Sequence, residues 1–173
     1  MIKLCRELTG KILDVGGGGE GVIGRLYTDH VIAIDNRKEE LDEAPEGFKK
    51  MLMDATDMSF DDNTFDCVTA FYSLMFMNEK TQEKALSESA RVLKEGGELH
   101  IWDCDIDSAY PEPFCIDVVV ELPDERLSVT YGICKQGRQS KGTIMDICTN
   151  VGLRFVAGKT DECGFYLRFI KED

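Results

Sequence analysis

Short apolar runs alternate with segments of helical period along the first part of the chain. The runs predict five strands, at Lys11–Val15, His30–Asp35, Lys49–Asp54, Phe65–Tyr72 and Glu98–Asp103. The intervening segments predict helices over Gly21–Asp29, Arg37–Ala44 and Glu79–Leu93, the last of them capped by Asn78. Because the strands are nearly continuous in apolar residues, this alternation indicates a parallel sheet that helices cover on both faces.

The last third of the chain follows a different pattern. Phe114–Glu121 and Leu127–Cys134 alternate like the arms of a hairpin, Ser140–Val151 has the period of a helix, and Leu153–Lys159 and Gly164–Lys171 predict two more strands. We therefore expect a doubly wound, Rossmann-like α/β fold. Its mostly parallel sheet would have seven strands, an antiparallel last strand and an extra hairpin after the fifth strand. With no internal repeat or linker, residues 1–173 form one expected domain, with an insertion or lid hairpin at about 105–134.

Acidic residues stand at or near the ends of four predicted strands. They are Asp14, Asp35, Asp54 and Asp103. In a parallel sheet with right-handed crossovers, the carboxyl ends of the strands meet along one edge, and ligands bind there. We therefore expect these four carboxylates to converge on a binding site.

A glycine-rich turn joins the first strand to the first helix. The spacing G-x-G-x-x-G from Gly16 to Gly21, with Asp35 in the second strand, fits a dinucleotide-binding loop, so a nicotinamide-dependent oxidoreductase is one interpretation. Two further acids argue against it, Asp14 just before the glycines and Asp54 after the third strand. A carboxylate at position 14 suits a ligand with an amino group and a sulfonium better than a pyrophosphate.

Four blocks of the sequence, in their order and spacing, resemble a known family. They are Ile12-Leu13-Asp14-Val15-Gly16-Gly17-Gly18, Ile34-Asp35, the segment from Asp54 to Asp66, and the segment from Ala85 to Gly97. The chain from about Lys11 to Asp103 resembles a class I S-adenosylmethionine-dependent methyltransferase, closest in style to the quinone-biosynthesis and type 11 enzymes. The resemblance implies S-adenosylmethionine as cofactor and S-adenosylhomocysteine as product, with an acceptor that the sequence does not name.

The resemblance also implies a set of cofactor-binding residues. They are Asp14, Gly16, Gly17, Gly18, Asp35, Asn36, Asp54, Ala55 and Phe71. In this family the glycine backbone packs against the methionine part of the cofactor, and Asp14 lies near its amino group. Asp35 accepts from both ribose hydroxyls, and Asp54 accepts from the adenine amino group. The Ala55 N–H faces the adenine ring, and Phe71 stands beside the methyl group.

One position departs from the family pattern, because Glu20 stands where a third glycine is usual. We expect Glu20 to cap the following helix rather than to reach the amino group of the cofactor. Methyl transfer from a sulfonium requires alignment and exclusion of water more than a general base, so no catalytic residue is assigned. Candidates for an acceptor-side role are Tyr72, Asp103 and Tyr110; for the carboxylate, helix capping or solvation is the alternative.

Charge and cysteine content narrow the partners. A net charge of −13 disfavours nucleic acid and anionic membranes. The seven cysteines include no Cys-x-x-Cys pair, so we expect reduced thiols and no metal site. The first residues lack the pattern of a signal peptide, which predicts a cytoplasmic protein. A small-molecule acceptor is the resulting expectation.

Several alternatives stay open at this point. The apolar arms of the hairpin predict that it covers the pocket, pairs across a homodimer interface, or both. The basic segment Lys135–Lys141 is a solvated turn, which we favour, or a clamp for an anionic acceptor. Besides methyl transfer, the chain is open to two other functions: binding S-adenosylmethionine without transfer, or NAD-dependent oxidation and reduction.

Overall fold

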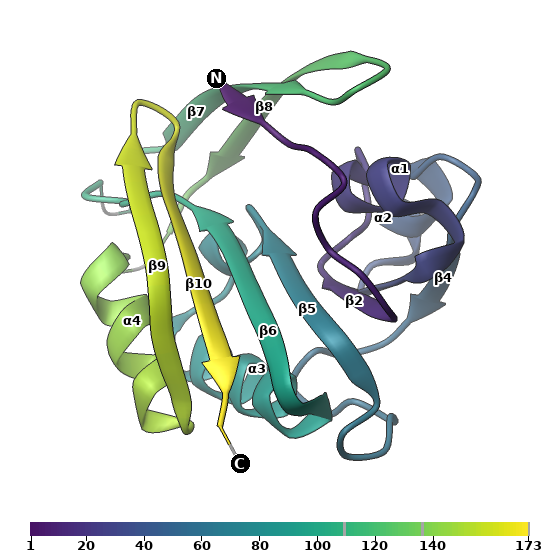
Figure 1. Ribbon diagram of the computed structural model, residues 1–173. Coiled ribbons are helices and arrows are strands. Elements are labelled where there is room, and N and C mark those ends of the chain that lie inside the picture. Colours follow the sequence, from purple (N-terminus) through teal and green to yellow (C-terminus); the bar gives the residue numbers. More distant parts are fainter. Residues whose placement is uncertain (109, 136, 173) are drawn as a thin grey trace.

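The central sheet has seven strands in the order β4-β3-β2-β5-β6-β10-β9 (Figure 1). This computed structural model describes residues 1–108, 110–135 and 137–172. Strand β10 is antiparallel to both of its neighbours, whereas the pairs among β2 to β6 are parallel, as predicted. The strands are β2 (Ile12–Val15), β3 (Val31–Asp35), β4 (Lys49–Leu52), β5 (Phe65–Phe71), β6 (Leu93–Asp103), β9 (Leu153–Asp161) and β10 (Gly164–Lys171).

Helices lie on both faces of this sheet, as a doubly wound fold requires. On one face, Leu86 of α3 and Ile144 of α4 share a buried cluster with Leu99 of β6. On the other face, Ile23 of α1 packs in a second cluster with Ile12 of β2. The helical elements are α1 (Val22–Tyr27), η1 (Thr28–His30), α2 (Lys38–Glu43), η2 (Leu74–Phe76), α3 (Glu79–Val92) and α4 (Lys141–Asn150).

The start of β6 differs most from the sequence prediction, which placed it at Glu98 after a glycine-terminated helix. Strand β6 already begins at Leu93, which pairs with Phe65 of β5. The register shifts just after Phe65, and Gly96 has a φ of 73°, so the glycine lies in an irregular part of the strand. The other boundaries fall within a few residues of the predicted ones, and Asn78 caps α3 as predicted.

A second, smaller sheet has three strands, β1 (Ile2–Lys3), β7 (Phe114–Glu121) and β8 (Arg126–Ile133). The predicted hairpin forms its β7–β8 pair. Strand β1 adds to it in parallel, with Ile2 opposite Val120, which the short N-terminal segment did not reveal. In Figure 1 this sheet lies above the arrowheads of β5 and β6. Val118 and Val120 are buried in the cluster that contains α1, so much of the apolar surface that suggested a dimer interface is covered within the chain.

Candidate active site

A cavity of about 480 Å³ lies at the carboxyl edge of the central sheet. The glycine loop 16–21, the end of β3, the segment after β4 and the segment after β5 form its walls. Thr130, Tyr131 and Gly132 of β8 also line it, so the hairpin contributes to its enclosure. This is the edge at which open α/β sheets bind ligands.

The glycine loop is a bare stretch of backbone along one wall. Gly16 has a φ of 72°, and a Cβ on it would lie 2.4 Å from the Cβ of Ser73. A Cβ on Gly17 would lie 2.4 Å from Oδ2 of Asp14. The N–H groups of both glycines donate to the carbonyl of Ile34, at 2.8 and 3.1 Å. Glycine is therefore needed where the loop packs against Ser73 and Asp14, and the same loop lines the cavity as a shelf of backbone beside Asp14.

Asp14 is the most deeply placed carboxylate of the cavity. It is 2% exposed, and its Oδ1 accepts a hydrogen bond from Thr69 Oγ1 at 2.7 Å. Burial raises the pKa of Asp14 to about 7, and the negative charge of Asp35 adds to this effect, whereas the Thr69 hydrogen bond opposes it. A cationic group placed beside Asp14 would favour its ionised form.

Asp35 and Asp54 each use one carboxylate oxygen to order the backbone that follows them. Oδ1 of Asp35 accepts from the N–H of Arg37 at 2.9 Å. Oδ1 of Asp54 accepts from both the N–H and the hydroxyl of Thr56 at 2.8 Å, and the N–H bond is the main cause that lowers the pKa of Asp54. Within the described residues, Oδ2 of each has no hydrogen-bond partner, which leaves an acceptor available to a ligand.

The structure brings all nine residues predicted to bind the cofactor to this one cavity. They are Asp14, Gly16, Gly17, Gly18, Asp35, Asn36, Asp54, Ala55 and Phe71. Tyr72, one of the acceptor-side candidates, lines it as well. The three acids at the ends of adjacent strands therefore share one cavity.

The other two acceptor-side candidates are not among the residues that line the cavity. Asp103 is fully buried and accepts from the N–H of Met75 at 3.1 Å, the N–H of Cys104 at 2.8 Å and Nε2 of Gln139 at 2.6 Å. Burial raises the pKa of Asp103 to about 6. Tyr110 is 64% exposed. The carboxylate at the end of β6 thus anchors the segment that follows β5.

The expected capping role of Glu20 was wrong. The N-cap residue of α1 is Gly21, with a φ of 56°, and no side chain caps this helix end. The family pattern usually has its third glycine at position 20, whereas this chain has glycine at position 21. Gly21 takes the left-handed conformation and so provides the turn one residue later. Glu20 instead lines the cavity, and its backbone carbonyl accepts from Nε of Arg25 at 2.7 Å.

Comparison with known proteins assigns the chain to a family. The model of the methyltransferase domain matches residues 13–101, which contain β2 to β5 and most of β6. The chain belongs to this methyltransferase-domain family. Family membership argues against the nicotinamide-dependent interpretation of the glycine loop.

Individual relatives match over part of their length. Phosphatidylethanolamine N-methyltransferase of Cereibacter sphaeroides is 36% identical, over 53% of this chain and 49% of that protein. Ubiquinone/menaquinone biosynthesis C-methyltransferase UbiE of Citrobacter koseri is 34% identical, over 54% of this chain and 36% of that protein. The alignments thus span half or less of these relatives. Among solved structures, the PH0226 protein of Pyrococcus horikoshii has a TM-score of 0.71 and 18% identity, over 96% of this chain and 85% of that one, which shows a shared fold.

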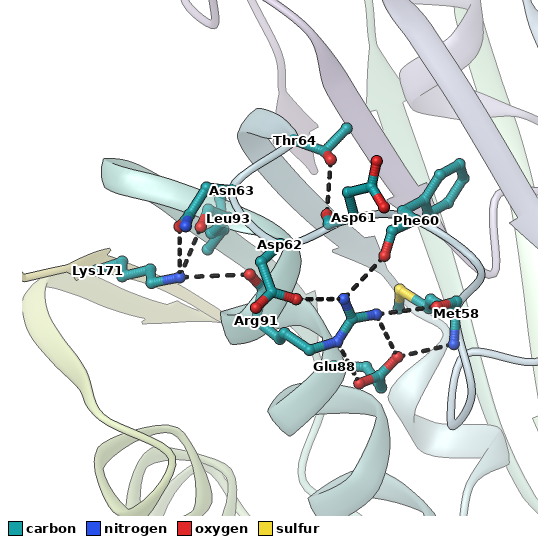
Figure 2. A network of polar contacts seen from close by, with 10 residues as sticks. All are labelled: Met58, Phe60, Asp61, Asp62, Asn63, Thr64, Glu88, Arg91, Leu93 and Lys171. Atoms are coloured by element: carbon teal, nitrogen blue, oxygen red, sulfur yellow. Dashed lines mark hydrogen bonds and ion pairs between the residues drawn. The ribbon is translucent and has the colours of Figure 1, made fainter.

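A polar network supports the segment that follows Asp54. Figure 2 shows Arg91 of α3 between Glu88 and the backbone of the segment that follows Asp54. The guanidinium donates to the carbonyls of Met58 and Phe60 at 2.9 and 2.8 Å, and Glu88 accepts from the N–H of Met58 at 2.8 Å. The ion pair between Glu88 and Arg91 therefore holds this segment in place from the adjacent helix.

Sequence reasoning missed the residues that the hairpin contributes. The ring of Tyr131 stacks on Tyr72, with 4.9 Å between centroids and 4° between planes. Ion pairs join the hairpin turn to the body of the domain, from Arg25 to Glu125 at 3.0 Å among others. The alternation of apolar residues predicted the two arms, but it carries no information about which side chain meets the cavity.

The basic segment Lys135–Lys141 does not contribute a described residue to the cavity wall. Lys135 is buried, and its Nζ donates to the carbonyl of Met75 at 3.0 Å and to Oε1 of Gln139 at 3.2 Å. Burial lowers the pKa of this lysine. Gln136 lies outside the described residues. The Lys135 ammonium therefore fixes the segment after β5, whereas Gly137 and Arg138 are exposed, as the favoured solvated turn predicted.

In residues 1–108, 110–135 and 137–172, no three His, Cys, Asp or Glu side chains gather in a group that could hold a metal ion. Over the same ranges, no helix is both long enough and apolar enough to cross a bilayer.

Proposed function

We propose that this chain binds S-adenosylmethionine in the cavity and transfers its methyl group to a small-molecule acceptor. The observation that carries the proposal is the meeting of Asp14, Asp35 and Asp54 with a bare glycine shelf in one cavity. Membership of the methyltransferase-domain family supports it. The residues fit the cofactor. Asp35 and Asp54 each have a carboxylate oxygen that can accept a hydrogen bond from it, and a cationic group beside Asp14 would favour the ionised form of that acid.

In this proposal each polar group of the cavity wall binds a different part of the cofactor. Asp14 would face the amino group from beside the glycine shelf. Oδ2 of Asp35 would accept from the ribose hydroxyls. Oδ2 of Asp54 would accept from the adenine amino group, while the N–H of Ala55 faces the ring. For Asp35 and Asp54, these roles use the carboxylate oxygens that have no partner within the described residues.

The bound cofactor would supply an activated methyl group, so the protein has to align the acceptor and exclude water. Phe71 and Tyr72 at the end of β5 would form the wall beside this methyl group. The hairpin supports exclusion of water, because Tyr131 closes over Tyr72. Burial raises the pKa of the Tyr72 hydroxyl, so it stays protonated and does not act as a base.

A small molecule is the proposed acceptor class. The hairpin partly encloses the cavity, which favours a compact acceptor over a polymer. The net charge of −13 disfavours polyanions. The two relatives described above are named for phosphatidylethanolamine and for ubiquinone or menaquinone biosynthesis.

Calorimetry tests the cofactor. The chain should bind S-adenosylmethionine and not NAD. Asp35→Asn keeps an acceptor for the N–H of Arg37 but removes the charge, so it should weaken S-adenosylmethionine by about 1.5–3 kcal/mol, the range of hydrogen bonds to charged groups. Asp42→Ala on the exposed side of α2 is the matched control and should leave the affinity unchanged. Binding of NAD alone would refute the proposal.

Transfer is tested separately from binding. The chain is incubated with methyl-labelled S-adenosylmethionine and with the small-molecule or the macromolecular fraction of a cell extract. Label should appear in the small-molecule fraction, together with S-adenosylhomocysteine. Label in the macromolecular fraction alone would overturn the acceptor class. Tight cofactor binding without label in either fraction would favour a binding protein without transfer activity.

A further inference from the structure

Tyr131 carries the one hydroxyl of the described cavity wall that no protein acceptor uses. The other hydroxyl-bearing side chains of the wall each donate within the chain. These bonds run from Thr56 to Asp54, from Tyr72 to the carbonyl of Cys163, from Ser73 to the carbonyl of Val15, from Thr81 to Asn78, and from Thr130 to Asp117. Buried polar side-chain atoms without a partner in the described ranges are Ser108 Oγ and Arg168 Nε. The Tyr131 hydroxyl is therefore open to the cavity rather than sealed in protein.

The position of this hydroxyl is fixed by its surroundings. The Tyr131 ring is stacked on Tyr72, and the next residue, Ser73, lies against Gly16 of the glycine shelf. The ring therefore enters the cavity at the end that holds the shelf. The carboxylates of Glu20 and Asp14 are close enough to add to the burial that raises the pKa of Tyr131, which agrees with this placement.

The charged groups of the cavity wall offer little attraction to a carboxylate of a ligand. Five carboxyl groups line the cavity: Asp14, Glu20, Asp35, Glu40 and Asp54. Among the described lining residues Arg37 alone is basic, and it pairs with Glu40 at 2.8 Å. A carboxylate on a ligand therefore meets little positive charge here. The raised pKa of Tyr131 means that its hydroxyl stays protonated. It can therefore donate a hydrogen bond to such a carboxylate without adding charge to the wall.

We propose that the hydroxyl of Tyr131 donates a hydrogen bond to the carboxylate of the methionine moiety of the bound cofactor, so that the hairpin closes directly on this ligand. This inference rests on the proposed function, which puts the methionine moiety beside Asp14 and the glycine shelf. Tyr131 is then a cofactor-binding residue that belongs to the hairpin rather than to the central sheet. Stacking on Tyr72 orients its ring before the ligand arrives, which reduces the entropic cost of the bond.

The test compares two ligands on three proteins by calorimetry. The ligands are S-adenosylhomocysteine and its decarboxylated analogue, which keeps the amine but lacks the carboxylate. The proteins are the unaltered chain, Tyr131→Phe, which keeps the stacked ring, and Tyr166→Phe as control. The hydroxyl of Tyr166 bonds to His100 outside the cavity, at 2.9 Å.

Tyr131→Phe should weaken S-adenosylhomocysteine about ten-fold, the worth of one hydrogen bond to a charged group, and leave the decarboxylated analogue unchanged. Tyr166→Phe should change neither affinity. Equal weakening of both ligands by Tyr131→Phe, or no weakening of either, would overturn the inference while the proposed function stands. Failure of the unaltered chain to bind S-adenosylhomocysteine would count against the proposed function itself.

Discussion

Asp14 differs from the other carboxylates of the cavity in what its ionisation costs the fold. Asp35 and Asp54 reach water, whereas Asp14 is buried and has Thr69 as its hydrogen-bond partner. Its pKa in the folded chain, about 7, lies above the ordinary value of 3.8. The contribution of this carboxyl group to stability is therefore fully present below about pH 4 and is lost as the pH rises through about 7.

Asp14→Asn should remove this loss of stability. The amide oxygen can still accept from Thr69 Oγ1, so the hydrogen bond is kept. We expect the free energy of unfolding of the variant to exceed that of the unaltered chain by about 2–4 kcal/mol at pH 8, and the difference to shrink toward zero near pH 4. Urea denaturation at a series of pH values measures it. A difference that does not depend on pH would show that Asp14 does not titrate as inferred.

At the scale of single residues, the sequence predicted well those parts of the cavity wall that lie at the ends of strands. Asp14, Asp35 and Asp54 were found because an acid at the end of a parallel strand must lie at one edge of the sheet. Asp103 obeys the same rule, yet its carboxylate points to backbone N–H groups, and a pattern of residue types cannot give that orientation. Tyr131 was missed because nothing in the alternation of an arm says where the hairpin folds back.

Among the elements, α3 does more than cover the sheet. Its last turns carry Glu88 and Arg91, whose side chains bind the backbone of the segment after β4 (Figure 2). The guanidinium makes bonds to two carbonyls and to two carboxylates, one of them on Asp62 at 2.7 Å. Glu88 and Arg91 both lie in the block from Ala85 to Gly97 that carries part of the family resemblance.

Arg91→Met should destabilise the fold by about 2–3 kcal/mol, because it removes charge-assisted bonds and leaves carbonyl groups without donors. The amides after Asp54 should also exchange hydrogen faster. Arg154→Met is a matched control, because its ion pair with Glu172 is exposed on both sides, and it should cost less than about 1 kcal/mol. Denaturation and hydrogen exchange measure both variants. Equal losses for the two would mean that the network contributes little.

Element types were predictable from periodicity, whereas one boundary was not. The helix ends at Val92, one residue from its predicted end, but the next strand starts at Leu93 rather than at Glu98, because Leu93 pairs with Phe65. Gly96 then serves an irregular strand in a conformation that other residues rarely adopt. Local sequence favours both outcomes, and the neighbouring strand decides between them.

In the whole molecule, the small sheet is held to the body mainly by apolar burial. Val118 and Val120 are almost fully enclosed, while the ion pairs at the hairpin turn are partly exposed to solvent. Exposed ion pairs contribute little to stability, whereas a buried valine contributes more. The cover of the cavity should therefore unfold together with the central sheet.

Val120→Ala should lower the free energy of unfolding by about 2 kcal/mol and leave a single transition. Val119→Ala, on the opposite side of the same strand, should cost less than about 1 kcal/mol. Trp102, the single tryptophan, reports on the central sheet by fluorescence, while far-ultraviolet circular dichroism reports on the whole fold. Two separated transitions would show that the cover is an independent unit.

The pairing of β1 with β7 has a consequence for biosynthesis. Ile2 is translated before the glycine shelf and the first five strands of the central sheet, whereas its partner Val120 is translated after them. Strand β1 therefore stays without its partner until β7 has been made, because long-range pairs close late. We expect the cavity wall at the glycine shelf to be assembled while the covering hairpin is still missing, so that a ligand can meet the nascent chain before the enclosure is complete.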